Sequence, residues 1–182
     1  MELKFENCCS LTKETLLAMQ RKSRNPIFLA AVIVLCVAYI VNGVRDVIAG
    51  YPEAMILPLV FSAALGLFAY FLPNILASVE NRKNVRKYGR EPKCITKFYD
   101  EKFVVENITA GSTVNVYYTR VVNFVQDERY IFIMLDNKSI APLDKQDFIT
   151  GTAEELMSFL ETRDTKLRKR KESGLFGLKK KK

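Results

Sequence analysis

Two long uncharged stretches, separated by a short loop, constrain what this chain can fold into. They are Ile27–Val44, of 18 residues, and Ala54–Val79, of 26 residues, with nine residues between them. As helices they would be about 27 Å and about 39 Å long, and the hydrocarbon core of a bilayer is about 30 Å thick. Backbone groups inside lipid must be hydrogen-bonded within their own segment. The sequence therefore predicts a two-helix transmembrane hairpin over residues 26–79.

A cleaved signal peptide is the competing interpretation of the first stretch. The apolar part of a signal peptide is about 7–15 residues long, begins near the N-terminus and ends at a small-residue cleavage site. Here the apolar run begins at Ile27, continues for 18 residues and is followed by Val47-Ile48-Ala49, a poor cleavage motif. The pattern favours a retained helix.

The segments on either side of the hairpin have a net positive charge, whereas the loop within it has a net negative charge. Residues 1–26 carry a net charge of +2, residues 80–93 carry +4 and residues 164–182 carry +7, whereas the loop 45–53 carries −1. Lysine and arginine next to membrane spans stay on the cytoplasmic side. We therefore expect an integral membrane protein with both termini in the cytoplasm.

The hairpin is preceded by a cytoplasmic leader at residues 1–25. Residues 2–6 alternate polar and apolar, which predicts a short strand, and Thr12 is a suitable N-cap for a helix that runs to Arg24. Asn25-Pro26 then ends this helix, because the residue before proline avoids the helical region. We expect the helix to lie at the membrane interface. Whether residues 2–6 pair with a later sheet stays open at this point.

The second span has small residues at Ser62 and Gly66, a spacing that lets another helix approach closely. Packing within the hairpin, against Ala38, is one interpretation, and a dimer interface is the other. No Asp, Glu, Lys or Arg lies inside either span, which argues against an ion or proton pathway. A small channel or a transporter-accessory subunit built from oligomerised hairpins is the alternative function, and the polar groups available to it are Asn42, Ser62 and Tyr70.

Residues 80–93 form a basic juxtamembrane linker that should extend the second helix until Gly89 and Pro92 end it. The apolar period then changes to two, and tight spacing between the strands predicts an antiparallel meander. The predicted strands are Cys94–Tyr99, Lys102–Ile108, Ser112–Tyr118, Val121–Gln126, Tyr130–Leu135 and Ser139–Leu143.

A final helix follows the strands. Thr152 precedes Glu155 by three residues, which is the pattern of a capping box, and the helix should end near Arg163. Its apolar face (Leu156, Phe159, Leu160) would close the sheet. The fold class is therefore a membrane α-helical hairpin plus a small α+β domain over residues 94–163, with a disordered basic tail at 164–182.

Local motifs in the sheet domain match those of a known family. They are Ser112–Val121 (STVNVYYTRV), Tyr130–Leu135 (YIFIML), Pro142–Lys145 (PLDK), Phe148, Gly151 and Phe159-Leu160. With the leader and the hairpin, they make the chain resemble the YcxB-like family of small bacterial membrane proteins. That family often has tryptophan followed by Ser or Asp where this chain has Tyr118-Thr119-Arg120, and this chain has no tryptophan. The resemblance implies a bacterial plasma membrane and a C-terminal YcxB-like domain, and it assigns no biochemical role.

Residue types that carry common chemistry are scarce in this chain. It has no histidine, four cysteines without a Cys-x-x-Cys pair, no Gly-rich phosphate loop and no nucleophile elbow. The nearest approach to a catalytic cluster is Asp144-Lys145-Gln146-Asp147, which we interpret as a turn with a solvated ion pair. We expect no metal, no cofactor and no enzymatic activity.

Basic charge next to the membrane is the strongest functional signal. Each lysine or arginine near an anionic leaflet contributes about 1 kcal/mol to membrane attraction. The domain 94–163 itself carries −4, which argues against nucleic acid as a partner. We therefore expect a membrane-anchored interaction or sensory domain that binds anionic headgroups of the bilayer, a protein partner or a second copy. The predicted membrane-surface residues are Arg82, Lys83, Arg86, Lys87, Arg90, Lys93, Arg168, Lys169, Arg170, Lys171, Lys179, Lys180, Lys181 and Lys182.

Overall fold

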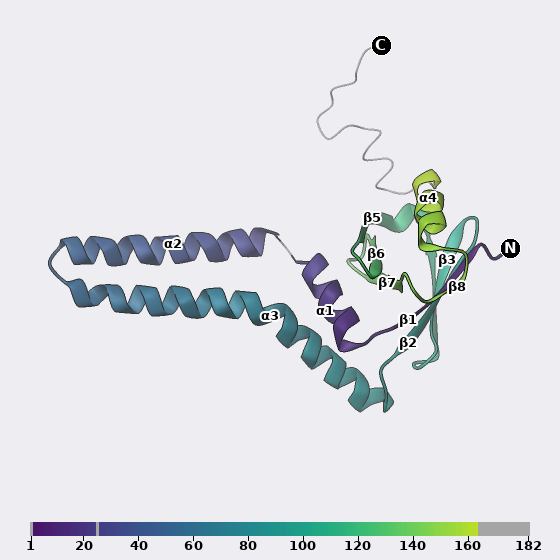
Figure 1. The fold of residues 1–182 in the computed structure, drawn as a ribbon, viewed down its shortest axis with the longest axis horizontal. Coiled ribbons are helices and arrows are strands. Elements are labelled where there is room, and N and C mark those ends of the chain that lie inside the picture. Colours follow the sequence, from purple (N-terminus) through teal and green to yellow (C-terminus); the bar gives the residue numbers. More distant parts are fainter. Residues whose placement is uncertain (1, 25, 164–182) are drawn as a thin grey trace, which may run out of the picture.

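The computed structural model describes residues 2–24 and 26–163, and it combines a long helical hairpin with two antiparallel sheets (Figure 1). In chain order the elements are β1 (Phe5–Ser10), α1 (Lys13–Lys22), α2 (Pro26–Ile48), η1 (Pro52–Met55), α3 (Ile56–Tyr88), β2 (Lys93–Phe98), β3 (Lys102–Asn107), β4 (Ser112–Tyr117), η2 (Tyr118–Arg120), β5 (Val121–Gln126), β6 (Tyr130–Leu135), β7 (Ile140–Asp144), β8 (Phe148–Thr150) and α4 (Ala153–Thr162).

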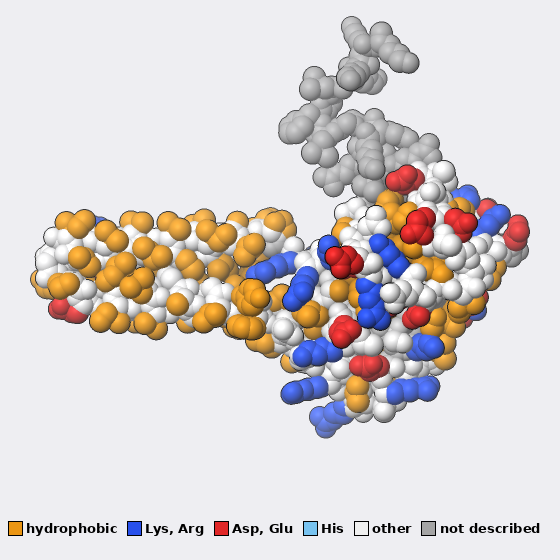
Figure 2. Space-filling model, in the orientation of Figure 1, with side chains coloured by type: hydrophobic (Ala, Val, Ile, Leu, Met, Phe, Trp, Pro, Cys, Tyr) orange, Lys and Arg blue, Asp and Glu red, His pale blue; other side chains and the backbone are white. Residues whose placement is uncertain are grey.

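The hairpin consists of α2 and α3, and side chains of apolar type cover the face shown in Figure 2. Both helical segments are long and apolar enough to cross a membrane, by length and composition. Only 11% of the most apolar window of the first segment and 6% of that of the second is buried. A core helix of a soluble protein would be mostly buried, so these helices are not the core of the described fold.

The two helices pack closely at the loop end of the hairpin. Gly43 is buried there, and a Cβ added to it would lie 2.8 Å from Met55 Sδ and 2.9 Å from Pro58 Cγ. Further along, the Ser62 hydroxyl donates to the Cys36 carbonyl over 3.4 Å. Ser62 thus bonds to Cys36 rather than facing Ala38, and a Cβ at Gly66 would meet nothing within 4 Å. Within the hairpin, close packing at a glycine therefore occurs at Gly43 rather than at Gly66, and a dimer interface at Ser62 and Gly66 stays a prediction.

Helix α3 continues beyond the hairpin, as the sequence predicts. It runs to Tyr88 and ends at Gly89, which adopts the left-handed conformation with φ of 71° and donates its N–H to the Val85 carbonyl. A residue with a Cβ is strained in this conformation, which explains why glycine occupies the position. The basic residues 82–87 therefore lie on a helix that is continuous with the second apolar segment.

The larger sheet includes the N-terminal strand. Its order is β4-β3-β2-β1-β8, with neighbouring strands antiparallel where their registers are defined. Strand β1 pairs with β2 from Phe5 opposite Phe98 to Ser10 opposite Lys93. The strand predicted at residues 2–6 thus lies at Phe5–Ser10, and the open question of its partner is answered: it sits between β2 and β8, inside the sheet of the C-terminal domain.

The single meander predicted from strand spacing is wrong. Strands β5, β6 and β7 form a separate three-stranded sheet. The short helical turn η2 separates β4 from β5, and Tyr118 within it is buried and donates its hydroxyl to the Tyr99 carbonyl over 2.7 Å. This anchored turn redirects the chain away from the edge of the first sheet. Short spacing excludes parallel crossovers, but it does not require consecutive strands to pair.

The hydrophobic core lies between the two sheets and α4. Phe98 and Phe103 from the first sheet, Ile131 from the second and Leu156 and Leu160 from α4 are fully buried in one cluster. The predicted capping box is confirmed, because the Thr152 hydroxyl accepts from Glu155 N–H and the Glu155 carboxylate accepts from Thr152 N–H. Helix α4 therefore closes the core, as predicted.

The position of β1 makes a prediction about folding. A fragment of residues 93–163 lacks the strand that pairs with both β2 and β8, so we expect it to lack a dispersed NMR spectrum and cooperative unfolding. A chain in which a Gly/Ser linker replaces residues 26–79 retains β1 and α1 and should show both. Equal spectra and equal stability for the two proteins would contradict this account of the sheet.

The two hairpin glycines make a second prediction, in which one is the control for the other. Alanine in place of a helical glycine gains about 1 kcal/mol of helix propensity, but overpacking costs about 1–3 kcal/mol. Gly66→Ala should therefore raise the melting temperature of the full-length protein in detergent, whereas Gly43→Ala should lower it. The same direction of shift for both variants would contradict the packing described at Gly43.

Candidate membrane-surface site

A group of exposed cations follows the apolar hairpin along α3 and into β2. We call it the juxtamembrane basic surface. All of its members are exposed, and none makes an ion pair with a carboxylate of the described residues. Arg82 and Arg86 are four residues apart, as are Lys83 and Lys87, so each pair lies along one helix face. The surface consists of Arg82, Lys83, Arg86, Lys87, Arg90 and Lys93.

Helix α1 brings further cations to the same end of the hairpin. Figure 1 shows that α1 lies beside α3, between the hairpin and the sheets. Arg21 and Lys22 occupy its last turn, where cations also interact favourably with the helix dipole. Figure 2 shows lysine and arginine side chains where the apolar hairpin meets the rest of the molecule. The structure therefore gathers basic residues from two separate segments of sequence.

Arg24 has a defined role at the base of the hairpin. Pro73 lies within α3 and has no N–H, so the carbonyl of Ala69, four residues earlier, lacks its usual helical partner. The Arg24 guanidinium donates to that carbonyl over 2.7 Å. Ala69 is buried, and a buried carbonyl without a donor is costly. Arg24 therefore compensates for the proline and connects the end of α1 to α3.

The opposite side of α1 is attached to the three-stranded sheet. Arg129 donates to Asp144 over 2.9 Å and reaches Glu14 of α1 at 3.5 Å. The Thr15 and Tyr130 hydroxyls are hydrogen-bonded at 3.2 Å. Thr15 is buried, so this contact lies inside the interface rather than at its rim. Helix α1 is thus bonded to the hairpin at one end and to the sheet at the other.

Asp144 differs from the solvated turn that the sequence predicts. It is 3% exposed, its carboxylate accepts from Arg129 rather than from Lys145, and its backbone N–H and carbonyl bond to the side chain of Asn7. Asp147, by contrast, is exposed. The sequence could not show that β1 brings Asn7 beside Asp144, because 137 residues separate them. Asp144 therefore anchors β1 to β7.

Two buried cysteines of the larger sheet, Cys9 and Cys94, are poorly suited to nucleophilic chemistry. Cys9 and Cys94 are opposite each other across β1 and β2. Burial, with smaller contributions from neighbouring acidic groups, raises the pKa of Cys9 to about 12 and that of Cys94 to about 11. The thiolate is the reactive form, so it is scarce at neutral pH. The described residues also contain no cluster of three or more His, Cys, Asp or Glu side chains able to hold a metal.

The other residues that the sequence singled out lie in the tail and on the hairpin. The tail cations at 168–171 and 179–182 lie outside the described residues. Of the polar groups considered for a channel, Asn42 and Tyr70 are exposed on the hairpin, and Ser62 bonds to the partner helix. Sequence reasoning missed the contact of Arg24. Its signal was an arginine just before the first span combined with a proline inside the second.

Comparisons with known proteins add no relative. A scan against models of protein families, a search of curated proteins and a search of solved structures each found no match.

The contact between Arg24 and Ala69 can be tested by a double-mutant cycle. Arg24→Leu should destabilise the full-length protein by about 1.5–3 kcal/mol, because it removes a hydrogen bond from a charged donor. In a Pro73→Ala background the new N–H can bond to Ala69, so the same change should cost less than about 0.5 kcal/mol.

Thermal or denaturant unfolding in detergent would measure both effects. Arg21→Leu is the matched control, because Arg21 is exposed and should tolerate the change in either background. An equal cost of Arg24→Leu in the two backgrounds would show that Arg24 does not compensate for Pro73.

Proposed function

We propose that this protein is an integral membrane protein whose hairpin crosses the bilayer and carries its sheets as a membrane-anchored interaction domain. The observation that carries this proposal is the exposed apolar surface of α2 and α3, which ends at cations that form no ion pair within the described residues. Exposure of such a large apolar surface to water is unfavourable, whereas lipid would cover it. Anionic headgroups would neutralise the cations at its end.

We propose the cytoplasm as the location of the sheets and of the N-terminus. The pairing of β1 with β2 brings both ends of the hairpin to one side of it. Cations outnumber acids on that side near the hairpin, whereas the loop 45–53 has a net charge of −1. The positive-inside rule then supports a cytoplasmic domain. The resemblance to the YcxB-like family supports a bacterial plasma membrane.

The proposed role of the domain is binding rather than catalysis. Its juxtamembrane basic surface would hold anionic headgroups and set its position over the bilayer. Strand β4 forms an edge of the larger sheet, carries no charged residue, and exposes Val114 and Tyr117. Such an edge can pair with another chain. A protein partner or a second copy of this protein would therefore bind there.

Cysteine accessibility tests this topology. In a chain whose four cysteines are replaced by alanine, single cysteines are introduced at Tyr51, in the hairpin loop, and at Glu128, in an exposed turn. An impermeant thiol reagent should label intact cells at position 51 and leave position 128 protected until the cells are opened. Gly50 is less suitable than Tyr51, because its φ of 97° disfavours a side chain.

The opposite labelling pattern would place the sheets outside the cell and overturn the proposed location. Labelling of neither position before the cells are opened, and of both afterwards, would show that the hairpin does not cross the membrane. The inverted membrane vesicle is the matched control, because in it the accessibility of the two positions should exchange.

A further inference from the structure

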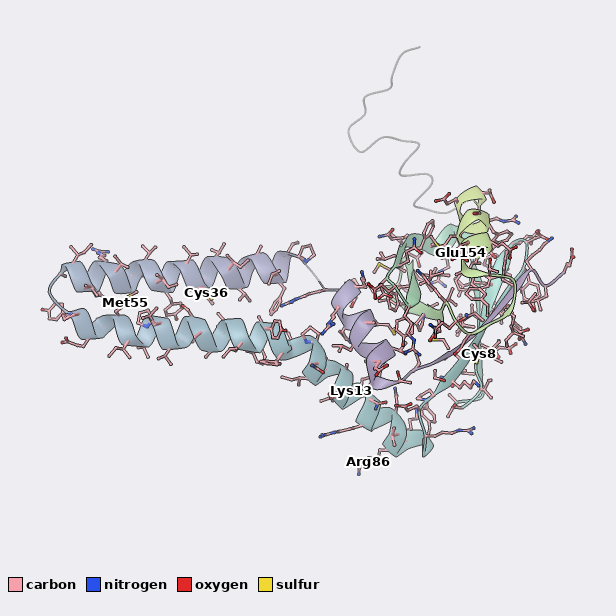
Figure 3. The ribbon with its side chains drawn as sticks, in the orientation of Figure 1. Cys8, Lys13, Cys36, Met55, Arg86 and Glu154 are labelled. Carbon is pink, nitrogen blue, oxygen red and sulfur yellow. The ribbon has the colours of Figure 1, made fainter. Side chains whose placement is uncertain are left out.

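A groove runs along α3 from the apolar hairpin to the juxtamembrane basic surface. Its volume is about 410 Å³. Two rows of side chains on α3 line it, each spaced by four residues, and Lys13 from the start of α1 completes it. Figure 3 shows Lys13 at the point where α1 begins, beside α3. The apolar row is Phe71, Ile75 and Val79, and the polar row is Asn74, Ser78 and Arg82.

The polar end of the groove has two cations. Lys13 and Arg82 are both exposed, and neither makes an ion pair within the described residues. Lys13 is also the first residue of α1, where the helix dipole favours an anion. Two unpaired cations from different helices thus face one opening.

The apolar row of the groove has the opposite character. Phe71 is 48% exposed, Ile75 47% and Val79 59%. These side chains continue the apolar surface of the hairpin into the groove. The groove therefore has an apolar row along α3, and the cation Arg82 lies one turn beyond its last member, Val79, at the level where the proposed membrane span ends. A phospholipid has the same order of chemistry, with an acyl chain followed by a phosphate.

We propose that this groove binds one anionic phospholipid, with its phosphate between Lys13 and Arg82 and an acyl chain along Phe71, Ile75 and Val79. The proposal rests on the membrane insertion of the hairpin proposed above, and it adds a discrete site to the general attraction of the basic surface. Free phosphate would use the cations but not the apolar row, so the groove matches a lipid rather than a soluble anion.

Native mass spectrometry of the full-length protein in detergent can test this site. Binding of phosphatidylglycerol should exceed binding of phosphatidylcholine, and one phosphatidylglycerol should bind more tightly than any further copies. The double variant Lys13→Gln with Arg82→Gln should weaken that first binding event about 30-fold, as expected for the loss of two charges that face an anionic headgroup.

Two further variants test the effect of overall charge and the role of the space inside the groove. Lys102→Gln with Lys138→Gln removes the same number of positive charges from the sheet domain, at residues that neither line the groove nor belong to the juxtamembrane basic surface, and it should leave the first binding event within about twofold of its original strength. Ser78→Phe fills the groove without a change of charge and should weaken binding as strongly as the loss of the two cations.

Three results would overturn the site. They are equal binding of the two lipids, an equal loss in the control variant, and displacement of the lipid by millimolar inorganic phosphate. A protein that is labelled as a transmembrane hairpin in the accessibility experiment, yet shows any of these results, would disprove the lipid site alone. Failure of the hairpin to cross the membrane would disprove the proposed function as well.

Discussion

The pairing of β1 with β2 is the constraint on which the rest of the structure depends. Six residue pairs connect these strands, and the whole hairpin, with α1, lies between them in the sequence. The hairpin is therefore an insertion between two paired strands of one sheet rather than an anchor attached to a separate domain. Because the sheet closes its base, both ends of the hairpin leave from one side, whatever the charges around it. A change of orientation would have to carry the entire sheet across the membrane.

Helix α1 connects the hairpin to the second sheet through side-chain contacts at both of its ends. Arg24 bonds to the carbonyl that Pro73 leaves without a donor in α3, and Glu14 and Thr15 contact Arg129 and Tyr130 of the second sheet. The ion pair of Glu14 is exposed and adds little stability, whereas the buried hydroxyl contact fixes the position of the helix. A partner bound to the sheets would thus be connected to the base of the hairpin through α1.

Local signals in the sequence predicted most helix ends and strands, but they could not predict which distant strands pair. The caps at Thr12 and Thr152 and the end of α3 at Gly89 follow from residues within one or two turns, and all are confirmed. The membership of β1 in the sheet depends on contacts across the hairpin, and the division into two sheets depends on the burial of Tyr118. Among the site residues, exposure of the six cations was predictable from their charge, but the groove with Lys13 required the packing of α1 on α3.

The distribution of ion pairs explains why the juxtamembrane basic surface is available to an external anion. Within the sheet domain, several cations form ion pairs with acids: Lys97 with Glu106, Arg120 with Asp136, and Arg163 with Asp100. The surface after the hairpin has Glu80 and Glu91 close in sequence, but neither forms an ion pair with its six cations. Exposed pairs are weak, so bringing an acid to each cation would gain little stability. A bilayer offers many anions at one level, and in the proposed function cations held on a continuous helix would meet them without ordering a flexible segment first.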